Sequence, residues 1–133
     1  EMEWKEQIDT SIPTLLIVSG VFQYFFEDKI IKFIKNLKKE FPYGELIFDT
    51  TTKNGLKFTN WFIKKTGNPE ALMHFYIEDS VNFSKKTDTI LVEELIFFKD
   101  ARELLRKKLS FITKLFMKIA DSKRQALIIH LKW

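Results

Sequence analysis

The sequence predicts an α/β fold built on an open, mainly parallel sheet in a single domain of 133 residues. Short, continuous apolar runs alternate along the chain with longer amphipathic segments, which is typical of strands joined by helical crossovers. Hydrophobic residues make up 45% of the chain and 14 residues are Phe, which is enough for a sizeable core. Cysteine is absent, which excludes disulfides and thiolate metal sites.

Four apolar runs are expected to form the strands. They cover residues 13–19, 45–52, 90–98 and 126–133. The first run is uninterrupted rather than alternating, so we expect it to be covered on both faces of the sheet. No strand–helix unit precedes this run, so the pattern resembles half of a larger doubly wound domain.

Three segments are expected to be helices. Residues 27–40 repeat apolar side chains every three or four positions, with acids in the first turn and lysines in the last. Residues 54–65 carry a mostly apolar face, and Asp100 is a suitable N-cap for a long amphipathic helix that reaches about residue 120. Residues 70–79 are expected to begin as a helix and continue as an extended piece over 74–77.

Candidate site residues follow the first and second strands. In open α/β sheets, ligands bind beyond the carboxyl ends of the strands. Ser19 and Gly20 lie at the first of these ends and Asp49 at the second. Gly20 permits a close approach of a ligand to the backbone, and Asp49 can accept a hydrogen bond or a proton. A glycine and an aspartate at strand ends also occur without any site, so that alternative stays open.

Aromatic residues crowd the segment after the first strand. Phe22, Tyr24, Phe25 and Phe26 are candidates to line a pocket there. The alternative is core packing, which is expected for at least Phe25 or Phe26. The four glycines of the chain are too scattered for a phosphate-binding loop.

Other chemistry finds little support in the sequence. His74 and His130 have no partner at metal-ligand spacing, and His130 is expected to be structural or exposed. A triad of Ser19, His130 and Asp49 lacks a nucleophile elbow and is not expected. Glu93 and Glu94 lie within the third strand, where exposure or pairing is a better explanation than catalysis.

Two motifs resemble a known family. The stretch PTLLIVSGVFQYF, residues 13–25, is similar to the pattern "P-T-L-hydrophobic-E/S-G-V/L-x-x-Y-F/L" of class I SAM-dependent methyltransferases, in the leucine carboxyl methyltransferase and polyketide-type O-methyltransferase group. FPYGELIFD, residues 41–49, resembles "F-P-x-G-x-L-x-F-D" of the same group. KKTGN at 64–68 and IED at 77–79 follow in the expected order, and Glu3-Trp4 resembles the family's acidic-Trp pair.

The resemblance implies a Rossmann-like sheet with strand order 3-2-1-4-5-7-6. This chain would supply strands 4, 5, 6 and 7, with residues 126–133 antiparallel. The Gly-rich turn and the ribose-binding acid of the family belong to strands 1 and 2, which this sequence does not include. The implied cofactor contacts are then Ser19, Gly20, Val21 and Tyr24, and the implied substrate contacts are Phe22 and Asp49. Many relatives have Glu at the position of Ser19, so no catalytic residue is assigned.

The implied function is that of the C-terminal half of a SAM-dependent methyltransferase, which methylates a carboxyl or hydroxyl oxygen of a small molecule or protein. We expect this truncated domain to be inactive alone and to bind S-adenosylmethionine poorly. Its expected partner is the missing N-terminal half. The alternative is a non-catalytic module that forms a homodimer through its exposed sheet edge.

The net charge of +4 raises nucleic acid or an acidic membrane as partners. The lysines are scattered and interleaved with acids rather than clustered into a stripe, so neither partner is expected, and we expect no metal and a cytoplasmic protein. The longest apolar stretch is too short and too interrupted to span a bilayer.

Overall fold

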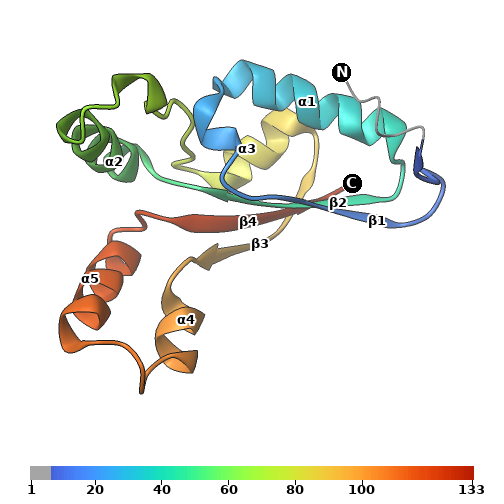
Figure 1. Ribbon diagram of the computed structural model, residues 1–133. Helices are drawn as coiled ribbons and strands as arrows, with labels where there is room; N and C mark the ends of the chain where they lie inside the picture. The colour runs from blue at the N-terminus through green and yellow to red at the C-terminus, as the bar shows by residue number, and fades with distance from the viewer. Residues whose placement is uncertain (1–6) are drawn as a thin grey trace.

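The fold is a four-stranded open mixed sheet with flanking helices (Figure 1). The computed structural model describes residues 7–133, so the expectation for Glu3-Trp4 lies outside the described residues. The strands are β1 (Thr14–Val18), β2 (Gly44–Thr50), β3 (Ile90–Ile96) and β4 (Leu127–Lys132), in the spatial order β1-β2-β4-β3. β1 and β2 are parallel, and β4 is antiparallel to β2 and β3, as predicted for residues 126–133.

Five helices connect the strands of the described chain. They are α1 (Glu27–Glu40), α2 (Lys53–Lys65), α3 (Ser80–Thr87), α4 (Lys99–Leu104) and α5 (Phe111–Ser122), with 3₁₀ turns η2 (Phe22–Tyr24) and η3 (Pro69–Ala71). The predictions for α1 and α2 are confirmed to within one residue. The short helix α3 was not predicted. Asp79 caps it by accepting a hydrogen bond from the amide of Asn82.

The single helix predicted over 100–120 is wrong, because the segment forms α4 and α5 with turns between them. Ser110 starts the second helix, where its hydroxyl accepts a hydrogen bond from the amide of Thr113. Asp100 lies in the first turn of α4, and Phe98 occupies the N-cap position instead.

The core fills one face of the sheet. Figure 1 shows α1 and α3 over this face. Alternate residues of β2 and β4 point into it, among them Leu46, Phe48 and Ile129, each at most 1% exposed. Aromatic rings fill the space under the helices, where Phe48 contacts Phe22, Phe75 and Phe83 at centroid distances of 5.1, 6.4 and 6.1 Å.

The opposite face is bare beneath β1 and β2. Leu15 and Ile17 point to it and are 53% and 69% exposed. Coverage of β1 on both faces, expected from its uninterrupted apolar run, is therefore wrong. Within residues 7–133, no helix packs over this face of β1, and β1 pairs with a strand at one edge only (Figure 1).

A polar cluster lies farther along the bare face. His130 on β4 faces Glu45 on β2, with 2.6 Å between Nε2 and Oε2, and Glu93 on β3, with 3.8 Å between Nδ1 and Oε1. Glu94 lies on the opposite, covered side, in register with Ile129, where it is paired with Arg124 at 2.5 Å and accepts a hydrogen bond from Ser80. These pairings agree with structural roles for His130 and for the two glutamates.

Candidate functional site

A single carboxylate holds the turn that follows β1. Asp49, near the carboxyl end of β2, accepts a hydrogen bond from the Gly20 amide at 2.7 Å through Oδ1. Its Oδ2 accepts from Gln23 Nε2 at 2.6 Å. Both oxygens of Asp49 are thus engaged in fixing the turn over residues 19–24. Its role in this structure is to position the backbone, which the sequence did not predict.

Gly20 is required by its backbone conformation. Its φ is +69°, in the left-handed region that glycine adopts readily and other residues rarely do. No atom lies within 4 Å of the position where a Cβ would stand. The expected freedom for a close approach at Gly20 therefore exists, and the side chain of Asp49 is the group that meets its amide.

The segment over 72–79 crosses the ends of β1 and β2. The carbonyl of Gln23 accepts hydrogen bonds from the amides of His74 and Phe75, at 2.7 and 3.3 Å. The amide of Ile77 donates to the Thr51 carbonyl at 2.8 Å. This segment is non-helical from Leu72 to Ile77, in agreement with the extended piece predicted there, and its hydrogen bonds to Gln23 help to hold the turn.

The aromatic residues of the turn divide between core and surface. Phe22 is only 5% exposed and packs edge-on against Phe33, with the ring centroids 5.9 Å apart. Tyr24, Phe25 and Phe26 are all exposed, so the expectation that Phe25 or Phe26 packs in the core is wrong. α1 begins at Glu27, directly after these residues, and the ring of Phe26 stacks instead on His74 at 4.5 Å.

An apolar hollow opens between the end of β1, the turn and α1. Its volume is about 580 Å³, which is within the range of small-molecule sites. The lining residues are Ile17, Val18, Ser19, Val21, Phe22, Phe25, Lys29, Ile30 and Phe33. Three of the six predicted contacts, Ser19, Val21 and Phe22, therefore line one cavity. Gly20 and Asp49 support its rim, and Tyr24 is not among the lining residues.

Lys29 supplies the hollow's charge and was not predicted. It is the one ionisable residue in the lining, and it lies four positions before Phe33 on α1. Residues four apart share a helix face, so the periodicity of residues 27–40 contained this signal. Gln23 was also missed, and its Oε1 is buried without a hydrogen-bond partner among the described residues.

Metal and triad chemistry find no support in residues 7–133. No group of three or more His, Asp or Glu side chains is placed to hold a metal ion there. Asp49 is engaged by the turn and His130 by Glu45, so these residues do not form a triad with Ser19. What the described residues bring together here is a backbone turn fixed by Asp49 beside an apolar hollow.

The chain is thus an α/β protein with an open mixed sheet and a hollow at the end of its first strand. Protein-family models give no match to the sequence, and a search of curated proteins finds no significant relative. Among the described residues, no helix combines the length and apolarity needed to cross a membrane.

Proposed function

We propose that this chain is the C-terminal half of a class I SAM-dependent methyltransferase domain, which transfers a methyl group to a carboxyl or hydroxyl oxygen. The order and direction of its strands carry the proposal. The observed order β1-β2-β4-β3 is the order that strands 4, 5, 7 and 6 would have in the arrangement 3-2-1-4-5-7-6. β4, in the place of strand 7, is the antiparallel strand, as the family resemblance implies.

The bare edge of β1 supports the same proposal. In the complete order, strand 4 has strand 1 as its second neighbour, and in residues 7–133 that side of β1 has no strand. The side chains of Leu15 and Ile17 are exposed beside this edge. An apolar edge strand of this kind needs a cover, because unpaired edges promote association. Strands 1 to 3 and their helices would supply that cover.

The residues of the turn fit one side of a cofactor only. The Gly20 amide already donates to Asp49, so among the predicted contacts only Ser19 offers a polar side chain in the lining of the hollow. When bound, S-adenosylmethionine supplies the methyl group. In this chain, Asp49 holds the turn, and Val21 and Phe22 form the apolar wall beside it.

Catalysis in this proposal rests on proximity and orientation rather than on an acid or base from this chain. The two oxygens of Asp49 are occupied by Gly20 and Gln23, so we assign it a positioning role. The missing half would bring the Gly-rich turn, whose amides fix the methionine part of the cofactor. The substrate, a small molecule or a protein, would enter from the side of the hollow.

Isothermal titration with S-adenosylmethionine tests the proposal. The 133-residue chain is expected to give no measurable heat, and a chain extended upstream in its own reading frame is expected to bind in the micromolar range. In the extended chain, Asp49→Ala should weaken binding, whereas Tyr43→Ser, an exposed change outside the hollow, should not. Clear micromolar binding by the 133-residue chain, or an upstream sequence without a strand and Gly-rich turn, would refute the half-domain proposal.

The exposed edge of β1 also favours a second function, that of a homodimeric interaction module. Two copies could pair their β1 edges across a two-fold axis and cover Leu15 and Ile17. Sedimentation equilibrium separates the alternatives. A dimer that persists at low micromolar concentration and is lost in Ile17→Lys supports the module, and a clean monomer at high concentration excludes it.

A further inference from the structure

The amphipathic helix α5 turns its apolar face away from the protein. Phe111, Ile112 and Phe116 are 79%, 64% and 68% exposed, and Leu115 and Ile119 on the same face are also exposed. The side that packs against the protein is less apolar and includes the buried carboxylate of Asp121. A surface helix normally does the reverse and buries its apolar stripe. The outward face of α5 is therefore available to a partner.

Helix α2 shows the same arrangement at the same end of the sheet. Phe58, Trp61 and Phe62 are exposed, whereas Gly55 is buried against the protein. The start of α2 lies close to the end of α5. Thr51 Oγ1, just before α2, donates a hydrogen bond to the carbonyl of Gln125, just after α5. We call the surface formed by α2 and by the α4–α5 segment, residues 99–122, the basic end.

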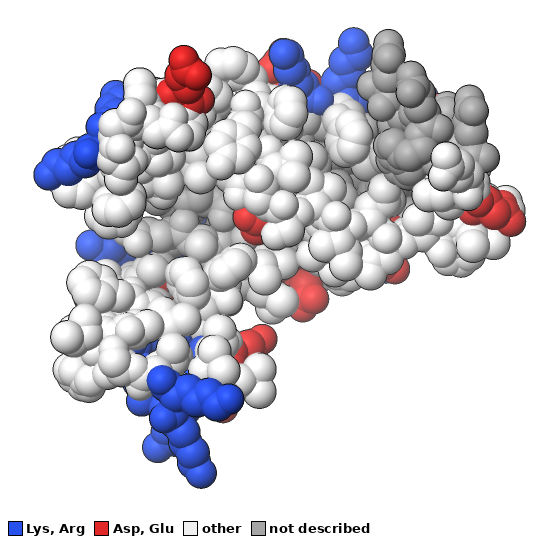
Figure 2. Space-filling view, in the orientation of Figure 1, with Lys and Arg blue, Asp and Glu red and all other residues white. Residues whose placement is uncertain are grey.

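The charge of the chain is concentrated at the basic end. Residues 104–120 contain five cations and residues 50–69 contain four, and neither range contains an acid. The whole chain has a net charge of +4, so the rest of it has a net charge of −5. The interleaving of lysines with acids therefore fails in these two ranges. Figure 2 shows basic side chains gathered at the tip of the lower lobe, which holds α4 and α5, with uncharged atoms above them and acidic atoms on one side of the lobe.

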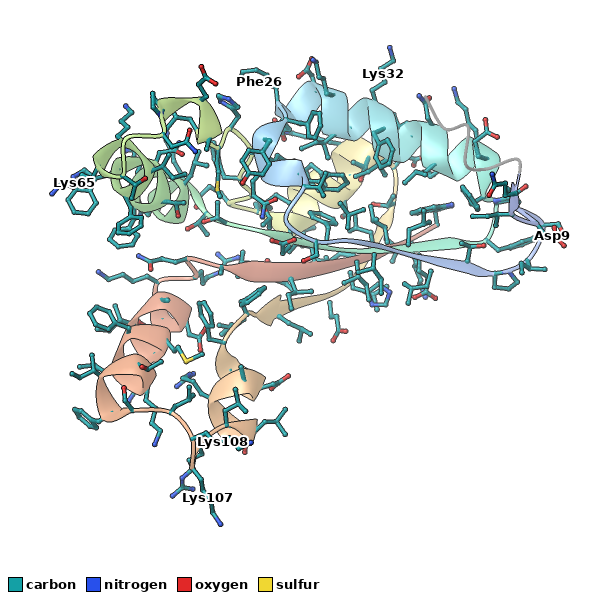
Figure 3. All side chains as sticks on the ribbon, in the orientation of Figure 1. Asp9, Phe26, Lys32, Lys65, Lys107 and Lys108 are labelled. Carbon is teal, nitrogen blue, oxygen red and sulfur yellow. The ribbon has the colours of Figure 1, made fainter. Side chains whose placement is uncertain are left out.

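The buried carboxylate of Asp121 ties α5 to α4 and to the residue before it. Asp121 accepts hydrogen bonds from Arg102 Nη2 at 2.6 Å and from the Phe98 amide at 3.1 Å. Figure 3 labels Lys107 and Lys108 at the tip, where they point away from the body of the molecule. The segment is thus a projection in which α4 and α5 are joined, with cations at its tip and bulky apolar side chains along α5.

We propose that the basic end docks on an anionic lipid bilayer. Surface-bound helices combine a Phe- and Leu-rich face with flanking lysines, and that face enters the boundary between headgroups and acyl chains. Lysine is depleted at protein–protein interfaces, whereas eight of the nine cations in residues 50–69 and 104–120 are lysines. The exposed aliphatic side chains of α5 also favour acyl chains over nucleic-acid bases as the partner.

This docking would place the chain on an anionic leaflet without any membrane-spanning helix. It revises the expectation of no membrane partner, which the interleaved lysines of the rest of the chain suggested. The inference does not depend on the methyltransferase proposal, because it uses α2, α4 and α5 rather than the turn after β1. Each can fail without the other.

Co-sedimentation with vesicles tests the inference. The 133-residue chain should bind vesicles of phosphatidylglycerol and phosphatidylcholine, and binding should fall steeply with salt and be weak on phosphatidylcholine alone. Loss of two cations in Lys107→Glu/Lys108→Glu should weaken binding about 30-fold or more, at about fivefold per cation. The matched control Lys32→Glu/Lys39→Glu, on exposed positions of α1, has the same net charge and should retain most of the affinity.

A second pair of variants tests the contribution of apolar side chains to vesicle binding. Phe116→Ser should lower binding about tenfold, whereas Tyr43→Ser, at a position that is 65% exposed on another part of the surface, should not. Both substituted side chains are exposed, so circular dichroism should show an unchanged fold. Three results would overturn the inference: equal losses in test and control variants, no binding to anionic vesicles at low salt, or tighter binding to single-stranded RNA than to vesicles.

Discussion

The two faces of the sheet differ although the same four strands build both. On the covered face, Leu46, Leu127 and Leu131 are fully buried under α1 and α3. On the bare face lie Ile17 of β1, 69% exposed, and His130, which precedes Leu131 and is paired with Glu45. The apolar content of β1 is as high on the bare side as on the covered side, yet only the covered side has a core.

The two faces of the sheet therefore govern different properties: the covered face governs stability, and the bare face governs association. Burial of apolar area stabilises the fold through the covered face, whereas exposed apolar residues on the bare face contribute little until something covers them. Substitutions on the covered face should therefore change the free energy of unfolding, and those on the bare face should change association.

The largest expected effect is on the covered face. Phe48→Ala should lower the free energy of unfolding by about 3–5 kcal/mol, because it leaves a cavity among Phe22, Phe75 and Phe83. Ile17→Ala on the bare face should change it by about 0.5 kcal/mol or less. Urea unfolding measures both, and equal losses would remove the distinction between the faces.

Asp49 is the exception on the bare side, because its register position faces that side but its side chain stabilises the turn. Asp49→Ala removes acceptors from Gly20 and Gln23 and should cost about 2 kcal/mol, the range for hydrogen bonds to a charged group. The amide resonance of Gly20 should shift in NMR spectra. A variant as stable as the wild type, with an unmoved Gly20 resonance, would show that the turn does not depend on this carboxylate.

A smaller effect is expected at Gly20. Gly20→Ala should destabilise the chain by about 1 kcal/mol, because alanine at φ +69° is strained even though the space is open. Thermal unfolding measures the loss, and Gly67→Ala, at φ +79° and also without neighbours, is the matched control. Similar losses at both positions would assign the effect to backbone conformation. A much larger loss at Gly20 would indicate that the Asp49 contact is also broken.

The smallest effect concerns an exposed ion pair far from both faces. Lys38 Nζ lies 2.8 Å from Asp88 Oδ2, and its hydrogen bond and charge hold the pKa of Asp88 below the usual 3.8. Because the pKa of Asp88 is lower in the folded state, the ion pair stabilises the fold at pH values above the unfolded-state pKa. This stabilisation is lost as the pH falls below about 3.8. Asp88→Asn should therefore lower Tm slightly at pH 7 and not at pH 2. High salt should reduce the difference at pH 7.

Periodicity in the sequence was sufficient for the strands and for α1 and α2. It failed at residues 100–120, because the apolar spacing of Leu104, Leu105 and Leu109 continues across the turns and hides the break. Ser110 was the readable signal there, as a capping residue before Phe111. The helix α3 is short and mostly polar, so it has no apolar period to detect.

The candidate site was predicted in position but not in geometry. The rule on carboxyl strand ends identified Gly20 and Asp49 separately. Their hydrogen bond joins residues 29 apart and depends on the register of β1 against β2, which composition does not encode. Coverage of β1 was predicted wrongly for a related reason. An apolar run shows that a strand needs cover, but it does not show which segment provides it.

Amide hydrogen exchange along β1 tests the half-domain account most directly. In the dilute 133-residue chain, the amides of Thr14–Val18 that point away from β2 should exchange within seconds, whereas those of β2 and β4 should be protected. In a chain extended upstream in its reading frame, the outward β1 amides should become as protected as β2, independently of concentration. Slow exchange in the dilute short chain, or unchanged fast exchange in the extended one, would contradict the account.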